Sequence, residues 1–414
     1  MEWKHYKMDE LIEEISMGPF GSDVKKEFYV DNGVPILNGS NLQGFKLQED
    51  SFGYLTKEKA DSLKKCNAHR GDIIVTHRGT LGQIVYVPIN SKYDRYVISQ
   101  SQFRFRCKAD LVDVQYLVYY FHTREGQYKI LANASQVGVP ALARATSTFR
   151  LIDIKLPPLA TQRRIASILS SLDRKIELNN KINADLEEMA QAIFKNWFVD
   201  FEPFKDGKFV DSELGMIPEG WKVGRLDEIA DVVGGSTPSK AKPEYYTQKG
   251  IAWLTPKDLS NHPAVYTSRG EIDITEEGYN STSTKLMPKG TILFTSRAPI
   301  GYISIAQNDI CTNQGFKSLV PKKAGTCFLY CFLKYVTPEI ENKSTGSTFK
   351  EASGSLMKSL QVIMPEQKVF EDFETIVSPL FARIESLEKE NSRLSLLRDT
   401  LLPRLMSGEL EVPE

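Results

Sequence analysis

The sequence predicts an α+β protein in which two duplicated, mixed α/β domains are separated by two long antiparallel coiled-coil helices, as a pseudo-twofold repeat. Two observations support this fold class: an internal repeat whose matching segments keep their order, and a heptad pattern that follows each copy. The chain has 414 residues, enough for two to three domains, and 41% of them are hydrophobic, enough for buried cores.

Five segments of the first half of the chain recur, in the same order, in the second half. The repeat starts at Trp3 with WKHYKMDEL and again at Trp221 with WKVGRLDEI. The longest match joins residues 70–87, RGDIIVTHRGTLGQIVYV, to residues 289–306, KGTILFTSRAPIGYISIA. The three shorter matches join VPILNGSNL to IAWLTPKDL, SQSQF to TNQGF, and IKLPP to VIMPE. Such an ordered set indicates duplication of one domain.

Each copy combines short strands with short helices. We predict strands at DIIVTHRG, QIVYVP, TILFTSR and YISIA, which are rich in β-branched residues and bounded by Gly or Pro. Helical patterns lie among these segments, at Val114–His122 and Phe328–Val336. Each copy is therefore expected to be α+β, with a mostly antiparallel sheet.

A long helical pattern follows each copy. Apolar residues, with a few Asn and one Arg, recur at alternating steps of four and three over residues 165–197 and 373–405. This period of 3.5 is typical of coiled coils, and Asn183 and Asn391 fall on equivalent seam positions, where a buried Asn fixes register. An ordinary helical hairpin would show similar stripes, but the duplication favours two partner helices in antiparallel pairing. Pro379 lies inside the second pattern and is expected to kink or split that helix.

Composition excludes several classes of protein. No apolar run reaches the length of a membrane-spanning helix, and the charged N-terminus lacks the apolar core of a signal peptide, so we expect a cytoplasmic protein. The five cysteines are odd in number and irregularly spaced, and Cys327 and Cys331 have no partner pair at zinc spacing. We therefore expect buried thiols and no metal. The net charge is −1, but both copies are mildly basic, which permits nucleic-acid binding without proving it.

No catalytic motif is recognised in the sequence. The segment GGSTPSK, Gly234–Lys240, looks superficially like a phosphate-binding loop, but its spacing differs from GxxxxGKS/T. A GxGxxG turn after a strand, an Asp/Asn-Pro-Pro-Tyr/Phe methyltransferase element and a GxSxG elbow are all missing from the sequence. We therefore expect a non-catalytic protein without a cofactor.

Two helical segments, Leu178–Pro203 (LNNKINADLEEMAQAIFKNWFVDFEP) and Glu390–Val412 (ENSRLSLLRDTLLPRLMSGELEV), carry a family resemblance. Together with the WKxxxxDE starts, the TxRxxxG loops and the PPLxxQ exits, they resemble the specificity subunit of type I restriction-modification systems. The resemblance covers essentially the whole chain. It implies that two target recognition domains each bind half of a split site in double-stranded DNA. It also implies two modification subunits, which bind S-adenosylmethionine and methylate adenine, and a motor-nuclease restriction subunit for cleavage.

The repeat and the resemblance together define the expected domain boundaries. The predicted segments are the first target recognition domain at 1–157, a central spacer helix at 158–200, a linker at 201–220, the second target recognition domain at 221–364 and a C-terminal spacer helix at 365–414. We expect the helices to set a gap of about five to eight base pairs between half-sites, since one DNA turn is about 10 base pairs.

Candidate DNA contacts come from polar loops at equivalent places in the two copies. Arg suits guanine, Asn and Gln suit adenine, Ser and Thr suit either, and Lys, Arg and hydroxyls bind phosphates. Arg78 and Arg297 are the strongest candidates, because each follows the same predicted strand. The full set of predicted contact residues is Asn38, Ser40, Asn41, Thr76, His77, Arg78, Gln100, Gln102, Gln136, Arg144, Thr255, Lys257, Thr295, Ser296, Arg297, Asn313, Gln314, Lys317, Ser347 and Lys350.

The helices are acidic, so we expect their exposed positions, such as Glu187 and Glu188, to face partner proteins rather than DNA. Two other functions fit parts of the pattern. A duplicated scaffold could bind two protein partners without contacting DNA, but the repeated Arg, Ser, Asn and Gln loops would then have no purpose. An RNA-binding protein would show aromatic platforms on strands, whereas the strand aromatics here alternate like core residues.

Overall fold

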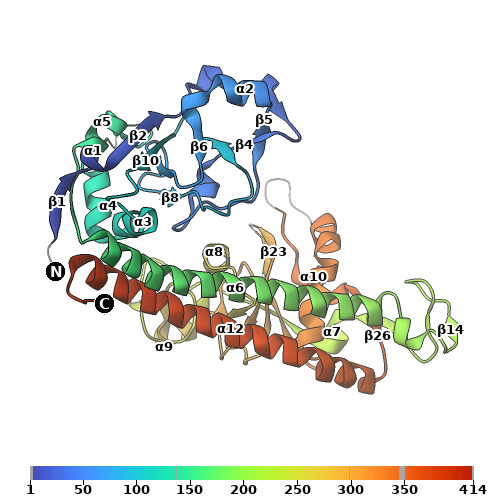
Figure 1. Ribbon diagram of the computed structural model, residues 1–414. Coiled ribbons are helices and arrows are strands. Elements are labelled where there is room, and N and C mark those ends of the chain that lie inside the picture. The colour runs from blue at the N-terminus through green and yellow to red at the C-terminus, as the bar shows by residue number, and fades with distance from the viewer. Residues whose placement is uncertain (1–2, 136–137, 298, 345–349, 413–414) are drawn as a thin grey trace. The chain divides into compact units, whose positions relative to one another are not determined.

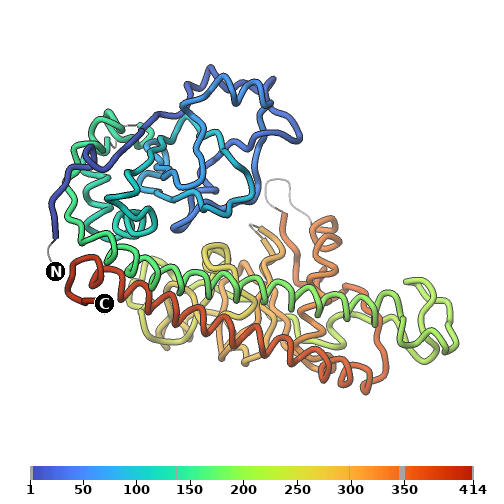
Figure 2. The backbone as a smooth tube through the Cα atoms, in the orientation of Figure 1, coloured from blue at the N-terminus to red at the C-terminus, as the bar shows by residue number. Residues whose placement is uncertain are grey.

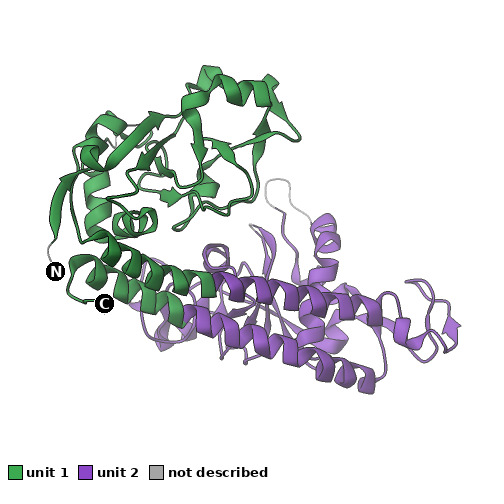
Figure 3. Cartoon of the chain, viewed as in Figure 1, with its two compact units in different colours: residues 1–175, 393–414 green, residues 176–392 purple. Residues whose placement is uncertain are grey.

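The computed structural model describes residues 3–135, 138–297, 299–344 and 350–412 (Figure 1). The chain divides into two compact units (Figure 3). Unit 1 comprises Met1–Lys175 with Arg393–Glu414, and unit 2 comprises Ile176–Ser392. Each unit mixes helices with sheets, which confirms the predicted α+β class. Throughout the described ranges, no helix combines the length and the apolar character that crossing a membrane requires.

The main sheet of unit 1 has four antiparallel strands in the order β2-β10-β7-β8. These strands are β2 (Ile12–Met17), β10 (Gln102–Cys107), β7 (Ile73–Thr76) and β8 (Ile84–Tyr86). The central strand β7 is the predicted DIIVT segment. All four of its residues are buried, because one face packs on helices and the other on a second sheet's cluster.

The second sheet of unit 1 has five strands in the order β3-β5-β4-β9-β6, and β4 and β9 pair in parallel. Two further strand pairs, β1 with β13 and β11 with β12, complete the unit. The strands not yet located are β1 (Lys4–Lys7), β3 (Tyr29–Val30), β4 (Val34–Ile36), β5 (Gly53–Leu55), β6 (Asn67–His69), β9 (Arg95–Val97), β11 (Ala134–Ser135), β12 (Ala141–Leu142) and β13 (Asp153–Leu156).

Short helices of unit 1 connect and cover these strands. They are α1 (Met8–Leu11), α2 (Lys57–Ser62), α3 (Val114–His122), α4 (Arg124–Leu131), α5 (Ala145–Arg150) and the 3-10 turns Gly21–Asp23, Lys26–Phe28, Gly39–Leu42 and Lys64–Cys66. Helix α3 has the predicted bounds. Asp113 caps its first turn by accepting a hydrogen bond from the Tyr116 N–H at 3.0 Å.

Unit 2 repeats this plan. Its main sheet has the order β17-β25-β22-β23-β20, which is the order of unit 1 with one parallel strand added at the edge. The strands of this sheet are β17 (Ala230–Gly234), β25 (Lys317–Pro321), β22 (Ile292–Ser296), β23 (Ile300–Ala306) and β20 (Tyr266–Thr267). The predicted TILFTSR and YISIA segments form its central hairpin, which confirms the duplicated sheet.

The smaller elements of unit 2 also have counterparts in unit 1. Strand β16 pairs with β26 as β1 pairs with β13, and the parallel pair β19 and β24 corresponds to β4 and β9. The elements are β16 (Lys222–Arg225), α7 (Leu226–Ile229), the 3-10 turn Pro243–Tyr245, β18 (Tyr246–Thr247), β19 (Trp253–Leu254), α8 (Pro256–Asn261), β21 (Asp273–Ile274), α9 (Glu276–Asn280), β24 (Cys311–Thr312), α10 (Thr326–Lys343), α11 (Gly354–Ser359) and β26 (Gln361–Met364).

The segment predicted as a linker is folded. A 3-10 turn, Glu202–Phe204, precedes the hairpin of β14 (Phe209–Val210) and β15 (Ile217–Pro218). Phe201 is buried in the core of unit 2, and its ring lies 5.7 Å from that of Trp221. This stretch therefore packs against unit 2.

Two long helices, α6 (Leu159–Phe198) and α12 (Gln367–Ser407), contribute residues to both units. They run side by side in opposite directions (Figure 2). Within unit 2 the seam pairs Asn179 with Asn391, where the Asn179 Nδ2 donates to the Asn391 Oδ1 at 2.8 Å. Within unit 1 the Arg398 guanidinium binds Asp173 at 2.8 Å. The predicted antiparallel pairing is confirmed.

Pro379 was expected to kink or split the second helix, and it does not split it, since α12 continues through this residue. Proline removes one backbone hydrogen bond and costs roughly 3 kcal/mol in a helix interior. Val377, Phe381 and Ile384 around it are almost fully buried in the core of unit 2. Their burial outweighs that cost, since each such side chain contributes about 1.5–3 kcal/mol.

Within unit 2, aromatic side chains pack helix α10 against the adjoining segments of α6 and α12. The ring of Phe328 on α10 lies 4.8 Å from Phe198 of α6 and 4.8 Å from Phe370 of α12. Phe194 and Phe373 extend the cluster at ring distances of 5.4 and 6.2 Å from Phe328. Phe328 is only 1% exposed, so one side chain joins three helices in a closed core.

We predict that Phe328→Ala destabilises unit 2 by about 3–5 kcal/mol, the usual cost of removing a buried ring. Urea unfolding followed by intrinsic fluorescence measures the change. Leu286→Ala, at an exposed position of the same unit, is the control and should change stability by less than about 0.5 kcal/mol. Equal effects of the two substitutions would contradict the assignment of Phe328 as a core residue.

Candidate functional site

Three loop segments of unit 1 meet where the central strand β7 ends. The His77 N–H donates to the Ser101 carbonyl at 2.8 Å, and the Leu142 N–H donates to the His77 carbonyl at 2.8 Å. The Gly79 N–H donates to the Pro140 carbonyl at 2.9 Å. Backbone hydrogen bonds thus join the three segments, and these bonds do not depend on which side chains the segments carry. We call these segments the strand-end loops of unit 1: residues 77–80, 99–102 and 138–144.

Unit 2 has the same arrangement at the end of β22. The Ser296 N–H donates to the Gly315 carbonyl at 2.8 Å, and the Ala352 N–H donates to the Ser296 carbonyl at 2.9 Å. Each bond matches one in unit 1, because Ser296 aligns with His77 in the repeat. The strand-end loops of unit 2 are residues 296–297, 312–315 and 350–353.

A glycine supports the middle loop in each unit. A Cβ atom on Gly18 would lie 1.9 Å from the Ser99 carbonyl oxygen, and one on Gly235 would lie 2.1 Å from that of Thr312. Any larger residue would force the backbones apart, so both positions require glycine. The neighbouring Ser236 N–H donates to the Thr312 carbonyl at 3.0 Å, which fixes this close approach.

In unit 1 the candidates Arg78, Gln100 and Arg144 are exposed on the strand-end loops. Arg144 has a φ of 48°, a left-handed conformation that is uncommon outside glycine and often marks functional loops. His77 is half-buried, and its Nε2 lies 3.2 Å from the Gln100 carbonyl. Burial lowers the pKa of His77, so its ring is neutral at physiological pH, and its one N–H donates to the Gln100 carbonyl.

In unit 2 the exposed candidates on the strand-end loops are Gln314 and Lys350. Arg297 and Lys317 share one carboxylate, Glu351, at 3.6 and 3.3 Å. Glu351 was missed from the sequence because a single acidic residue on a polar loop carries no signal by itself. Its place beside Arg297 follows from the Ala352 hydrogen bond, which brings two distant segments together.

Five of the predicted contact residues are buried, so the prediction that their side chains lie at the surface is wrong. They bond inside the fold, so their side chains are not available to a ligand in this structure. Thr76 donates to Gln83, Gln102 accepts from the Ser99 N–H, and Thr295 donates to the Pro299 carbonyl. The buried set is Asn41, Thr76, Gln102, Thr295 and Ser296. Polar residues at the ends of buried strands satisfy the backbone there, which sequence alone does not distinguish from surface polarity.

The Asn38 and Thr255 candidates form matching helix caps. The Asn41 carboxamide accepts the Asn38 N–H at 2.9 Å, and the Asp258 carboxylate accepts the Thr255 N–H at 2.7 Å. These reciprocal caps begin equivalent turns and explain why the polar pair recurs. The following residues Ser40 and Lys257 are exposed, as is Asn38, so this loop still presents polar groups. Asn313 is partly exposed.

Two remaining candidates, Gln136 and Ser347, lie outside the described residues. The exposed or partly exposed candidates that the structure does describe are Asn38, Ser40, His77, Arg78, Gln100, Arg144, Thr255, Lys257, Arg297, Asn313, Gln314, Lys317 and Lys350. They offer hydrogen-bond donors, amides and cations on rigid loops. In the described ranges, no cluster of His, Cys, Asp and Glu has the geometry of a metal site.

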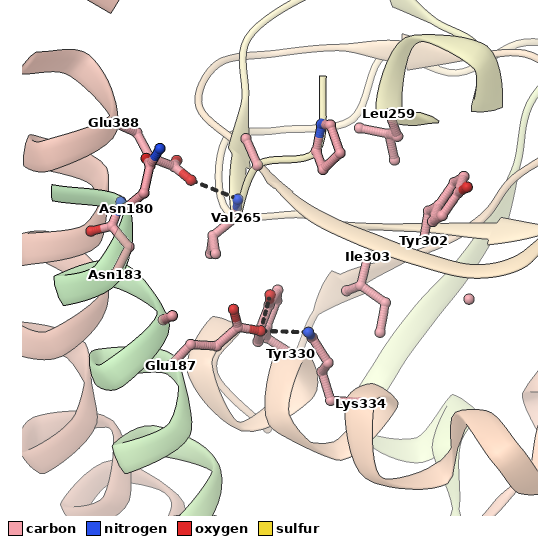
Figure 4. Close-up of a pocket in the computed structure, with 14 residues that line it drawn as sticks. Asn180, Asn183, Glu187, Leu259, Val265, Tyr302, Ile303, Tyr330, Lys334 and Glu388 are labelled. Atoms are coloured by element: carbon pink, nitrogen blue, oxygen red, sulfur yellow. Dashed lines mark hydrogen bonds and ion pairs between the residues drawn. The ribbon is translucent and has the colours of Figure 1, made fainter. Parts of the chain in front are cut away.

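Two carboxylates of the helix pair bind the rest of unit 2 (Figure 4). Glu187 of α6 accepts a hydrogen bond from the Tyr330 hydroxyl at 2.8 Å and pairs with the Lys334 Nζ at 2.5 Å. Glu388 of α12 accepts the N–H groups of Val265 and Tyr266 at 2.8 and 3.0 Å. The expectation that Glu187 is an exposed helix position is therefore wrong.

A cavity of about 400 Å³ with a mixed polar and apolar lining lies beside these carboxylates in unit 2 (Figure 4). Burial raises the pKa of Glu388 to about 7, and the negative charges of Glu187 and Glu385 add to that rise. The Val265 and Tyr266 N–H groups, which donate to this carboxylate, lower its pKa but do not cancel the rise. Glu388 therefore titrates near neutral pH. The neighbouring Glu188, unlike Glu187, is exposed as expected.

Unit 1 uses a corresponding contact. The Tyr119 hydroxyl donates to one oxygen of Asp173, and the Arg398 guanidinium binds the other oxygen at 2.8 Å. Arg398 also stacks over the Phe45 ring, with 5.0 Å between the guanidinium carbon and the ring centroid. Arg398 is the one Arg at a seam position of the heptad pattern over residues 373–405. The structure shows that it neutralises a carboxylate facing the domain.

Comparisons with known proteins agree with the duplication. The family model described as "Type I restriction modification DNA specificity domain" matches residues 1–188 and again residues 218–395. The chain is 25% identical to the Type I restriction enzyme HindI specificity subunit of Haemophilus influenzae, over 99% of this chain and 100% of that one.

Two further similarities differ in extent. The Type I restriction enzyme MjaIX specificity subunit of Methanocaldococcus jannaschii is 41% identical over 190 residues, which cover 45% of this chain and 44% of that one. The crystal structure of a type I restriction-modification S subunit from M. genitalium has the same fold, with a TM-score of 0.59 at 19% identity. That match covers 98% of this chain and 96% of the other.

The titration of Glu388 predicts a pH dependence of folding. Its pKa of about 7 in the folded chain lies above the ordinary value of 4.5, so its contribution to stability is fully present below about pH 4.5 and is lost as pH rises through 7. Glu388→Gln cannot ionise, so the wild type should lose roughly 1–3 kcal/mol relative to this variant between about pH 5 and 8.

Urea unfolding at a series of pH values measures this difference. Glu371→Gln, at an exposed position of the same helix, is the matched control and should follow the wild type at every pH. If the free energies of unfolding of the wild type and of Glu388→Gln differ by the same amount at every pH, the predicted titration of Glu388 is contradicted.

Proposed function

Because the chain belongs to the family of type I restriction modification DNA specificity domains, we propose that it binds a split double-stranded DNA site. It acts as the non-catalytic specificity subunit of a type I restriction-modification complex. Each unit binds one half-site, and partner subunits methylate adenine and cleave the DNA. The observation that carries the proposal is the duplicated set of strand-end loops, which the same backbone bonds hold in both units.

The side chains on these loops suit DNA. Arg78 and Arg144 in unit 1, and Arg297 in unit 2, carry planar guanidinium groups that match guanine edges and phosphates. Gln100 and Gln314 carry amides that suit adenine. Because backbone bonds fix the loops, their side chains differ between units without changing the scaffold. Each unit can therefore recognise a different sequence.

The proposed partners are two modification subunits, which bind S-adenosylmethionine, and a motor-nuclease restriction subunit. The long helices are the proposed docking surface. Leu178 and Met189 of α6 are exposed in unit 2, and Leu396 and Leu397 of α12 are exposed in unit 1. Exposed apolar residues on helices are typical of protein contacts. We place the complex in the cytoplasm, where its DNA substrate lies.

A scaffold that binds two proteins without contacting DNA is not favoured. Its helices would look the same, but it would not need two loop sets rich in Arg and amides. Genome-wide mapping of methyladenine tests the proposal, in cells that carry this chain with a modification subunit. We expect methylation at one split site. Methylation that does not depend on this chain would overturn the proposal.

Each half-site should depend on its own arginine. We predict that Arg78→Ala and Arg297→Ala each weaken DNA binding by the assembled complex by about 1–3 kcal/mol, and that they relax recognition at different half-sites. Electrophoretic mobility shift with mapped sites measures both effects. Arg70→Ala is the control, because Arg70 precedes β7 at the end of the strand opposite Arg78. Loss of binding in the control alone would place the DNA face elsewhere.

The helices should set the distance between half-sites. Inserting about four residues after Asn180 in α6, and the same number after Asn391 in α12, adds roughly 6 Å at 1.5 Å per residue. The two insertions are matched because Asn391 donates to Asn180 at 2.7 Å, so lengthening one helix alone would break the seam.

The expected result is an unchanged pair of half-sites with a gap longer by one or two base pairs, since a base pair rises about 3.4 Å. Methyladenine mapping of the variant beside the parent measures the gap. An active variant with an unchanged gap would show that something other than the helices sets the spacing.

A further inference from the structure

The segment Gly234–Lys240, GGSTPSK, supports the middle strand-end loop through Gly235 and Ser236, and in unit 2 it also borders a cavity of about 850 Å³. Cavities of about 300–1,000 Å³ are the usual size for nucleotide-sized ligands. Thr237 and Lys240 of this segment line the cavity with Lys257 on the opposite loop. Asn313 and Gln314, from the strand-end loops, also line it. The cavity is therefore continuous with the proposed DNA-binding loops.

The charge of the cavity is positive. Lys240 and Lys257 line it, and none of the described residues around it is acidic. Lys257 has an ion pair with Glu271 at 3.7 Å, but both side chains are more than 70% exposed, so water screens the pair. Lys240 has no ion pair within the described ranges. Both ammonium groups are therefore available to an anion.

The wall of the cavity is aromatic and rigid. Tyr246 and Trp253 lie edge to face with 5.9 Å between ring centroids. Both hold the GGSTPSK segment, because the Trp253 Nε1 donates to the Ser236 carbonyl at 3.1 Å and the Tyr246 hydroxyl donates to the Pro238 carbonyl at 2.6 Å. The Thr237 hydroxyl also bonds the Gln314 side chain. A segment held in this way presents its lysine without first having to become ordered.

The first copy of the repeat lacks these cations. At the offset that aligns Gly18 with Gly235, the counterpart of Lys240 is Asp23, and the counterpart of Lys257 is Ser40. Asp23 accepts the Phe20 N–H at 3.0 Å, so a carboxylate stands at the position of Lys240 itself, and the exposed lysines of this loop, Lys25 and Lys26, align instead with Lys242 and Pro243. Duplication alone therefore does not explain the basic cavity.

We propose that this cavity binds the sugar-phosphate backbone of one DNA strand next to the half-site of unit 2. Lys240 and Lys257 hold phosphate, and the aromatic wall contacts the adjoining sugar. Unit 1 has no such contact, so the footprint on DNA is asymmetric. This inference rests on the proposed function, and it adds a sequence-independent anchor to the base-reading loops.

Salt titration of DNA binding tests the anchor with the full chain assembled with its modification subunits. The probes are a random-sequence duplex and a duplex that carries the mapped site. Loss of one phosphate contact lowers the slope of log K against log salt by about 0.9. We therefore expect Lys240→Ala and Lys257→Ala each to reduce the slope by about one and to weaken binding to both duplexes equally. Lys240→Arg should restore the slope.

Lys323→Ala is the matched control, since this exposed lysine follows the opposite end of β25 from the strand-end loops. It should leave the slope unchanged. Ethylation of phosphates beside the second half-site, and not beside the first, should interfere with binding. Wild-type slopes in both cavity variants, while Arg297→Ala still weakens binding, would overturn the anchor and leave the proposed function standing. A wild-type complex that binds neither duplex would overturn the proposed function itself.

Discussion

Each unit depends on how its domain is fixed to the pair of long helices, and a tyrosine-carboxylate bond does this in both. Tyr119 binds Asp173 in unit 1, and Tyr330 binds Glu187 in unit 2. The two tyrosines lie on the helices that follow the main sheets. Apolar packing against a helix tolerates rotation, whereas a hydrogen bond has a direction. A carboxylate half removed from water also needs partners, which Arg398 and Lys334 supply. The bond therefore fixes the orientation of each domain on the helices.

The duplicated loops follow a second constraint, which is that backbone and not side-chain contacts hold them. The bonds of His77 and Ser296 are equivalent although one residue is an imidazole and the other a hydroxyl. Gly18 and Gly235 are alike because the backbone behind the loop leaves no room for a Cβ atom. The exposed side chains of Arg78, Gln100 and Arg144 are thus not needed to hold the loops. A scaffold of this kind allows sequence recognition to change while the fold stays the same.

Much of the fold was predictable because its signals are periodic and local. The helices α6 and α12, the antiparallel pairing and the paired central strands follow from heptads, β-branched runs and the ordered repeat. Pro379 does not split α12, because the helix propensity of one residue is weaker than the burial of Val377 and Phe381 beside it.

The candidate site was less predictable, because exposure is a tertiary property. Thr76 and Thr295 end buried strands and bond within the loops, while Arg78 two residues after Thr76 is exposed. The strand pattern does not separate these cases. Glu187 was misjudged in the same way, since only the packing of α10 against α6 shows that Tyr330 and Lys334 face it. Sequence patterns locate the loops, and tertiary contacts decide which side chains remain available.

The net charge of the chain is −1, so its binding to DNA depends on the local charges of the loops. These charges also affect how strongly it prefers one DNA site over others. Attraction of lysine and arginine to phosphate is the same for every sequence, so free cations strengthen unwanted binding as much as wanted binding. In unit 2, Glu351 lies between Arg297 and Lys317 and lowers that attraction. In the proposed function, a guanine edge competes for Arg297 through two hydrogen bonds in a fixed geometry, which a phosphate at a random position does not reproduce. We infer on that basis that Glu351 weakens non-specific binding more than binding to the correct site.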